Sequence, residues 1–169
     1  MSTFTYQIIK DSTKQTVIKL TGEFTNTTNE SNVARIAANT LYRPLDANNN
    51  LLISGNTAKP YYGLSVYRVW YDVSIPSGHL TLSWSGDNTY PIITMSGRGE
   101  YNSAGNWLAI SNPISGANVN GNIGISSYNA AANASYSIII ELHKDNNYYD
   151  SGKLIEPSAF NYGRYGVTP

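Results

Sequence analysis

Short β-prone runs separated by turn residues recur along almost the whole chain, and this pattern restricts the possible folds more than any other feature. Residues 4–10 and 16–24 are the first two runs, and the polar segment 11–15 between them predicts a β-hairpin. Side chains alternate between the two faces of a strand, so Ile18 and Leu20 fall together on one face. We therefore expect these strands to bury one face against a core.

Residues 63–75 form the longest strand candidate, and both of its faces carry large side chains. Strict alternation places Val66 and Trp70 on one face, and Val69 and Tyr71 on the other. A strand with two bulky faces is typical of a central position in a sheet, because neither face suits contact with water. We expect this strand to be covered on both sides, or on one side by another subunit.

Residues 79–95 predict a second hairpin, with its turn at 86–88. Leu80, Leu82 and Trp84 occupy every second position of its first strand, so their side chains point the same way. This pattern adds two more antiparallel strands to the prediction.

The remaining segments contain one strong strand, one weak helix candidate and one long polar stretch. Residues 136–142 are the most strongly β-branched run of the chain and predict a core strand. Residues 30–41 have apolar side chains at roughly helical spacing, although a strand or an irregular segment fits nearly as well. Residues 111–134 either contain short strands, such as 122–127, or are ordered by contacts outside the domain.

Many short strands, frequent turns and little helix predict an all-β fold. We expect a single antiparallel β-sandwich or jelly-roll-like domain over residues 1–145. Residues 146–169 predict an extended C-terminal arm, because Pro157, Gly163 and Gly166 exclude a regular helix or a central strand there.

A low and balanced charge restricts the kinds of partner. Only 13% of the residues are charged and the formal net charge is zero, so the clustered Lys and Arg that bind nucleic acid are missing. The same balance argues against attachment to an anionic membrane. No apolar run approaches the roughly 18 residues of a membrane-spanning helix. The chain has no cysteine, so disulfides and Cys-ligated zinc are excluded.

Residues able to perform catalysis or bind a metal are few. His79 and His143 lie in strand patterns that predict surface or rim positions, and no nucleophile elbow, phosphate-binding loop or zinc-binding helix motif is present. Residues 46–50 begin like a calcium loop but continue with Leu51 where glycine is required, so an ordinary Asx turn explains them better. We expect no enzyme activity, no cofactor and no metal.

The chain is rich in tyrosine, with 14 Tyr and 3 Trp against 3 Phe. Tyr and Trp combine apolar area with a polar tip, which suits surfaces that a partner covers. A sugar-binding module would use a few rings as a flat platform, for which Trp84 and Trp107 are candidates. A structural subunit would spread its rings over contacts with neighbours. The second possibility predicts a protein interface on the aromatic residues of the arm: Tyr148, Tyr149, Phe160, Tyr162 and Tyr165.

Four stretches, at residues 36–41, 67–72, 95–107 and 159–169, resemble small virion structural proteins of tailed phages. The likeness is greatest to the proteins of contractile-tailed phages of marine and freshwater bacteria, including cyanophages, and it extends along the whole chain. The resemblance implies a protein without catalytic residues that is assembled into the virion in the cytoplasm of a bacterial host.

These observations together predict a non-enzymatic structural protein of a phage particle. We expect a decoration or cement protein that binds the major capsid protein or other virion proteins and forms a homo-oligomer, because a neutral surface suits a subunit of an assembly. A position at the head–tail junction (the neck) or in the tail is the nearest alternative. A carbohydrate-binding or host-recognition module is the alternative from another class.

Overall fold

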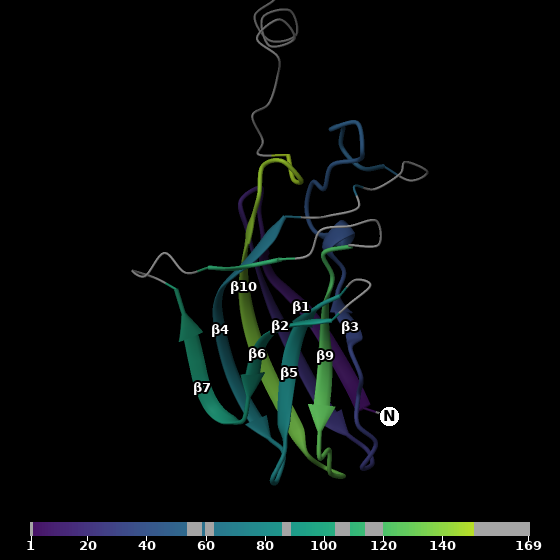
Figure 1. The fold of residues 1–169 in the computed structure, drawn as a ribbon, viewed down its shortest axis with the longest axis vertical. Helices are drawn as coiled ribbons and strands as arrows, with labels where there is room; N and C mark the ends of the chain where they lie inside the picture. The colour runs from purple at the N-terminus through teal and green to yellow at the C-terminus, as the bar shows by residue number, and fades with distance from the viewer. Residues whose placement is uncertain are drawn as a thin grey trace, which may run out of the picture.

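Two antiparallel β-sheets pack face to face to form the domain (Figure 1). The computed structural model describes residues 2–53, 59, 63–85, 89–103, 109–113 and 120–150. Within these ranges the chain forms ten strands and one short 3-10 helix, and it contains no α-helix. No helix in the described part of the chain is long and apolar enough to cross a membrane.

The larger sheet has six strands. Five of them are paired in the order β1 (Ser2–Asp11), β2 (Gln15–Phe24), β10 (Ser135–Lys144), β4 (Leu64–Ser74) and β7 (Gly97–Asn102). The sixth, β8 (Ile110–Ser111), pairs with β4. The smaller sheet has the order β3 (Val33–Ile36), β9 (Ile123–Tyr128), β5 (His79–Trp84) and β6 (Tyr90–Met95).

The strand order is that of a jelly roll. Apart from the hairpin strand β1 and the short β8, the sheets run β2-β10-β4-β7 and β3-β9-β5-β6, so most neighbouring strands are distant in sequence. The predicted all-β sandwich of jelly-roll type is therefore confirmed. The hairpin predicted for residues 4–24 is β1–β2, and the strand predicted at 136–142 is β10, in the middle of the larger sheet.

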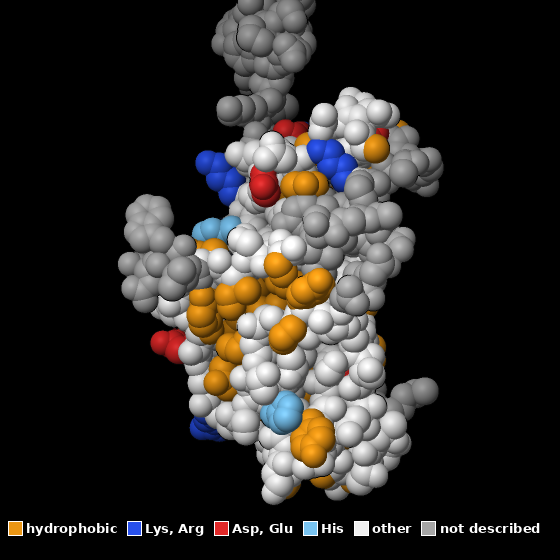
Figure 2. Space-filling model, viewed as in Figure 1, with side chains coloured by type: hydrophobic (Ala, Val, Ile, Leu, Met, Phe, Trp, Pro, Cys, Tyr) orange, Lys and Arg blue, Asp and Glu red, His pale blue; other side chains and the backbone are white. Residues whose placement is uncertain are grey.

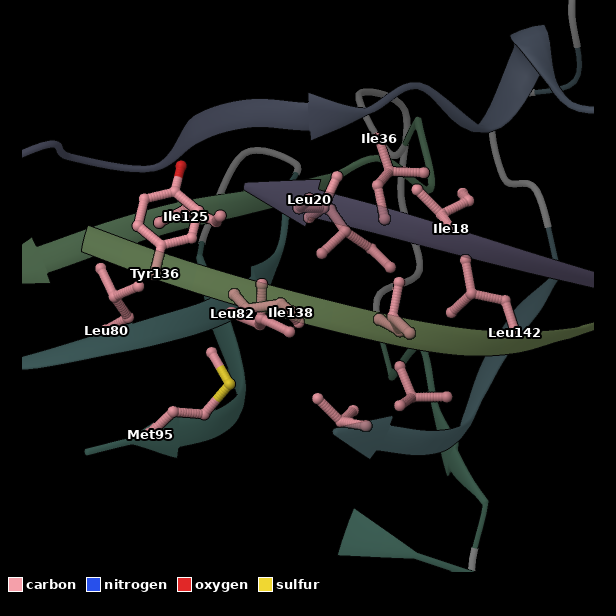
Figure 3. Packing of buried hydrophobic residues seen from close by; sticks show 14 of the residues in the cluster. Ile18, Leu20, Ile36, Leu80, Leu82, Met95, Ile125, Tyr136, Ile138 and Leu142 are labelled. Atoms are coloured by element: carbon pink, nitrogen blue, oxygen red, sulfur yellow. The ribbon is translucent and has the colours of Figure 1, made fainter. Parts of the chain in front are cut away.

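Alternation along the strands creates the core between the sheets (Figure 3). The larger sheet contributes the following buried side chains: Ile18, Leu20, Val66, Val69, Tyr136, Ile138, Ile140 and Leu142. The smaller sheet contributes these: Ile36, Leu80, Leu82, Trp84, Met95, Ile123 and Ile125. The predicted inward face of 16–24 is correct, because Ile18, Leu20 and Phe24 are buried. In the predicted core strand 136–142, Ile138, Ile140 and Leu142 are buried, whereas Ile139 is half-buried.

A β-bulge in β4 corrects the alternation predicted for residues 63–75. Leu142 pairs with Val66 and Glu141 pairs with Arg68, so Tyr67 is an extra residue between them. The extra residue reverses the alternation, and Val66 and Val69 both face the core. Trp70 consequently lies on the outer side of the larger sheet and does not share a face with Val66.

The segment predicted as a possible helix, residues 30–41, contains no α-helix. It forms β3, which pairs with β9, and then a single 3-10 turn at Ala38–Thr40. The β-branched residues Val33 and Ile36 fit a strand at the sheet edge better than a helix. The strand β9 also answers the open question about residues 111–134, since it lies close to the predicted 122–127.

Residues 146–150 pack onto the domain. Tyr149 is completely buried, and its hydroxyl group donates a hydrogen bond of 2.9 Å to the backbone carbonyl of Ala38. An isolated β-bridge joins Tyr149 to Pro44, and the carboxylate of Asp150 accepts hydrogen bonds from Arg43. The part of the predicted arm that contains Phe160, Tyr162 and Tyr165 lies outside the described residues.

Candidate functional site

The two tryptophans predicted as a sugar platform do not form one in the described structure. Trp84 is only 1% exposed, and its ring belongs to the core between the sheets, so its assignment to a surface is wrong. Trp107 lies outside the described residues. Trp70 instead is half-buried on the outer side of the larger sheet. The sequence alone did not identify it because the bulge at Tyr67 reverses the alternation of β4.

Glu141 is the centre of a polar cluster on that outer side. Its side chain projects from β10 between β2 and β4, and the residue is only 8% exposed. Gln15 donates a hydrogen bond from its side-chain amide to Glu141 Oε1, and His143 Nε2 lies 3.3 Å from the same oxygen. Arg68 Nε lies 3.9 Å from Glu141 Oε2. Three neighbouring strands therefore place three polar groups around one carboxylate.

Aromatic rings border this polar cluster. The ring of Tyr67, the bulge residue, stacks on His143 with 4.1 Å between ring centroids and an angle of 13° between the planes. The Arg68 guanidinium lies 5.5 Å from the centroid of Tyr67 and 6.0 Å from that of Trp70. We name this surface the Glu141 face, and it consists of Gln15, Tyr67, Arg68, Trp70, Glu141 and His143.

A shallow, open hollow adjoins Trp70 on the same sheet. Its volume is about 340 Å³, and Ser137 and Ile139 of β10 form part of its lining. Asp72 and Arg98 also line it, with 2.7 Å between Arg98 Nε and Asp72 Oδ2. The hollow combines an aromatic ring, an aliphatic side chain and paired charges, which is a composition suited to an uncharged polar ligand.

The Glu141 face has groups for binding, but the residues that the structure describes do not form the hydrogen bonds of a hydrolytic triad there. Such a triad needs a nucleophile hydrogen-bonded to the histidine, and the histidine oriented by a third group. Ser65 is the hydroxyl residue paired with His143, and its hydroxyl group bonds to that of Ser111 instead. Among the described residues, no three His, Asp or Glu side chains gather closely enough to hold a metal ion.

A second surface is apolar and lies where the smaller sheet does not cover the larger one. The strand β7 lies at the edge of the larger sheet, beyond β6 of the smaller sheet (Figure 1). Figure 2 shows hydrophobic side chains gathered on this part of the molecule. The half-buried residues Tyr71, Ile92, Ile93, Tyr101 and Ile110 pack against the core here, from β4, β6, β7 and β8. We name this surface the apolar ledge.

His79 and the turn at residues 46–50 are further candidates for functional groups, and both have local contacts that explain them. His79 is half-buried and stacks on the exposed ring of Tyr128, with 5.1 Å between centroids, in agreement with its predicted place at the surface. Asp46 accepts backbone hydrogen bonds from Asn48 and Asn50, which is the predicted Asx turn.

The two described tyrosines of the predicted arm differ in position. Tyr149 cannot contact a partner, because it is part of the core, and its assignment to an interface is therefore wrong. Tyr148 is half-buried, and Lys59 Nζ lies 5.1 Å from its ring centroid.

Comparison with known proteins found no matching family model, curated protein or solved structure. Function is therefore inferred from the two surfaces.

Proposed function

We propose that this chain is a non-enzymatic structural protein of a tailed-phage particle, most specifically a decoration or cement protein on the head. Its partners would be the major capsid protein, other virion proteins and further copies of itself. The observation that carries the proposal is the apolar ledge, a group of half-buried aromatic and aliphatic side chains that pack against the core and are partly accessible.

The ledge has the composition of a protein interface. Interface cores are more apolar than the rest of a protein surface, enriched in aromatic residues such as Tyr, and depleted in charged residues. The ledge supplies Tyr71 and Tyr101 beside three isoleucines. The hydroxyl end of Tyr71 lies over Gly99 of β7, where an added Cβ would approach it to 2.4 Å. Such a surface tolerates water when free and gains stability when a neighbour covers it.

Two further features support assembly as the role of the ledge. The neighbouring edge strand β7 has one paired side, against β4, among the strands described, so a neighbour's strand has room to extend the sheet while its side chains cover the ledge. Net charge is zero, so repulsion between adjacent copies is weak. Jelly rolls occur in viral capsid domains and also in lectins, so the fold by itself supports neither role over the other.

The test is retention on particles. Tagged protein would be expressed during infection of the producing host, and purified particles would be analysed for bound copies by mass spectrometry. We expect wild-type protein on the heads, and loss of it when Ile92→Asp places a charge on the ledge. Tyr128→Asp, a charge on the opposite end of the smaller sheet's outer side, is the matched control and is expected to be retained.

Absence of the wild-type protein from particles would contradict the proposal. Immunogold labelling of the particles distinguishes the positions, since label on the head supports a decoration protein and label at the neck or tail supports the alternatives. Light scattering of the free protein would give its oligomeric state, and we expect a mass above that of one chain for wild type and a smaller mass for Ile92→Asp.

A further inference from the structure

We propose that the Glu141 face binds a neutral carbohydrate, with a sugar ring stacked on Trp70 and its hydroxyl groups bonded to Glu141 and Arg68. This role is independent of the apolar ledge and goes beyond assembly. It also places sugar binding on residues other than the tryptophans that the sequence indicated.

The aromatic part of the argument concerns Trp70. Sugar rings present an apolar face of C–H groups, and they are bound in proteins by stacking on a partly exposed aromatic ring. Trp70 is half-buried, so its position is fixed by neighbouring strands while part of the ring is accessible. Trp70 pairs with Ile139 across the β4–β10 ladder, and both line the hollow, which provides an apolar floor beside the ring.

The polar part concerns hydrogen bonds that are arranged before any ligand binds. Glu141 can accept hydrogen bonds only, whereas Arg68 can donate only, so the two together match a hydroxyl group or a pair of adjacent hydroxyl groups. Gln15 and His143 hold the Glu141 carboxylate in place. The Arg68 side chain is 33% exposed, so the accessible part of its guanidinium can donate to a ligand oxygen, whereas its Nε is buried. Preorganised groups reduce the entropy lost on binding.

The charges of the face favour a neutral ligand. Arg68 lies beside Glu141, and Arg98 lies beside Asp72, so both arginines are balanced by a neighbouring carboxylate. A phosphate or another anion would be repelled by these carboxylates. An uncharged polar ligand such as a saccharide needs no net charge.

The shape of the surface indicates a chain of sugars more than a small enclosed molecule. Enclosed pockets bury most of a small ligand's area. The hollow beside Trp70 is open and shallow, so it would cover one side of a ligand and leave the ends free. A surface polysaccharide fits this geometry.

The test uses the full chain and a panel of soluble polysaccharides: dextran, mannan, xylan, a β-1,3-glucan and chitin oligosaccharides, together with the polysaccharide purified from the producing host. Binding is measured by retardation in gels that contain each polysaccharide and by quenching of tryptophan fluorescence. We expect at least one polysaccharide to bind wild type, and Trp70→Ala and Glu141→Gln each to weaken binding about tenfold or more, which corresponds to the loss of one good contact.

Two further variants keep the test decisive. Ser137→Arg fills the hollow from its lining without altering the core, so it should abolish binding even if Trp70→Ala fails to fold. Tyr128→Ala removes an exposed ring from the other sheet and should bind like wild type. The proposal is overturned if no polysaccharide of the panel binds, or if Trp70→Ala or Ser137→Arg binds normally. Loss of particle retention in Ser137→Arg without any sugar binding would assign the face to a protein neighbour and would also overturn it.

Discussion

The ring of Tyr136 lies over Gly22, its partner across the β2–β10 ladder. A Cβ atom added to Gly22 would come within 2.4 Å of Tyr136 Cζ, which is closer than two carbon atoms can approach. Tyr136 is buried, and its ring centroid lies 6.0 Å from that of Phe24. The ring therefore has little space into which it could move.

Gly22→Ala is expected to destabilise the domain by about 2 kcal/mol, because the added methyl group forces the ring of Tyr136 into the packed core. Urea unfolding would measure the change. Gly99→Ala is the control, since its Cβ would meet Tyr71, which is only half-buried and can swing outward. An equal decrease in the free energy of unfolding for the two variants would show that burial of the tyrosine ring over the glycine does not determine the effect.

Stability should fall at alkaline pH through Tyr136. Burial raises the pKa of Tyr136 from 10.0 to about 12, with a smaller opposing effect from the Arg35 charge. The unfolded chain therefore loses this proton at a lower pH than the folded chain, and the free energy of unfolding decreases as pH rises from 10 toward 12. Between about pH 8 and about pH 11, ionisation of Tyr136 should lower the free energy of unfolding by about 1.4 kcal/mol.

Tyr136→Phe lacks the titrating hydroxyl group and should lose less stability over the same pH interval. Urea unfolding of both proteins at the two pH values measures the difference. A parallel decrease in wild type and variant would mean that other groups cause the alkaline loss.

Breaking the ion pair between Lys144 and Asp11 is expected to lower the free energy of unfolding more than breaking an ion pair at the surface. Lys144 Nζ is buried 2.5 Å from Asp11 Oδ1, and it also donates to the backbone carbonyls of Ser12 and Tyr42. Burial lowers the pKa of Lys144, and Asp11 opposes this shift. Asp11→Ala would leave a buried cation without its carboxylate and should cost about 3 kcal/mol.

Asp72→Ala is the matched control for this ion pair. Asp72 lies 2.7 Å from Arg98, whose side chain is 84% exposed, so its removal should cost less than about 1 kcal/mol. Thermal unfolding of the two variants under the same conditions compares the pairs. A loss for Asp11→Ala no larger than that for Asp72→Ala would contradict the structural importance of the buried pair.

Truncations should show that the folded domain extends beyond Asp145 to include Tyr149. A chain ending at Asp150 keeps the buried ring and its bridge to Pro44. A chain ending at Asp145 loses the ring and the bridge to Pro44, and its unfolding temperature should be lower by several degrees. Tyr149→Phe keeps the ring, removes the hydroxyl group that donates to the Ala38 carbonyl, and should cost about 1 kcal/mol. Equal unfolding temperatures for the two truncations would contradict this boundary.

The sequence predicted the jelly-roll class, the first hairpin and the core strand at 136–142, because residues such as Ile138 and Ile140 repeat at the period of a strand. It did not predict the Glu141 face. One additional residue, Tyr67, reverses the alternation of β4, and a bulge leaves no mark in a strand pattern whose two faces are both bulky. The burial of Tyr149 was also not predicted. It depends on a contact with Ala38, which is distant in sequence, and a local pattern does not show such a contact.

The central place of β10 has a consequence for how the protein is made. Its neighbours β2 and β4 are synthesised much earlier, and the larger sheet cannot close before β10 has left the ribosome. At ordinary rates of translation, β2 waits on the order of ten seconds for this partner. During that interval its apolar face, including Ile18 and Leu20, is exposed to solvent and to chaperones or other chains. Chaperone binding to the nascent chain is therefore expected to be strongest just before residue 135 emerges and to end abruptly once β10 is inserted.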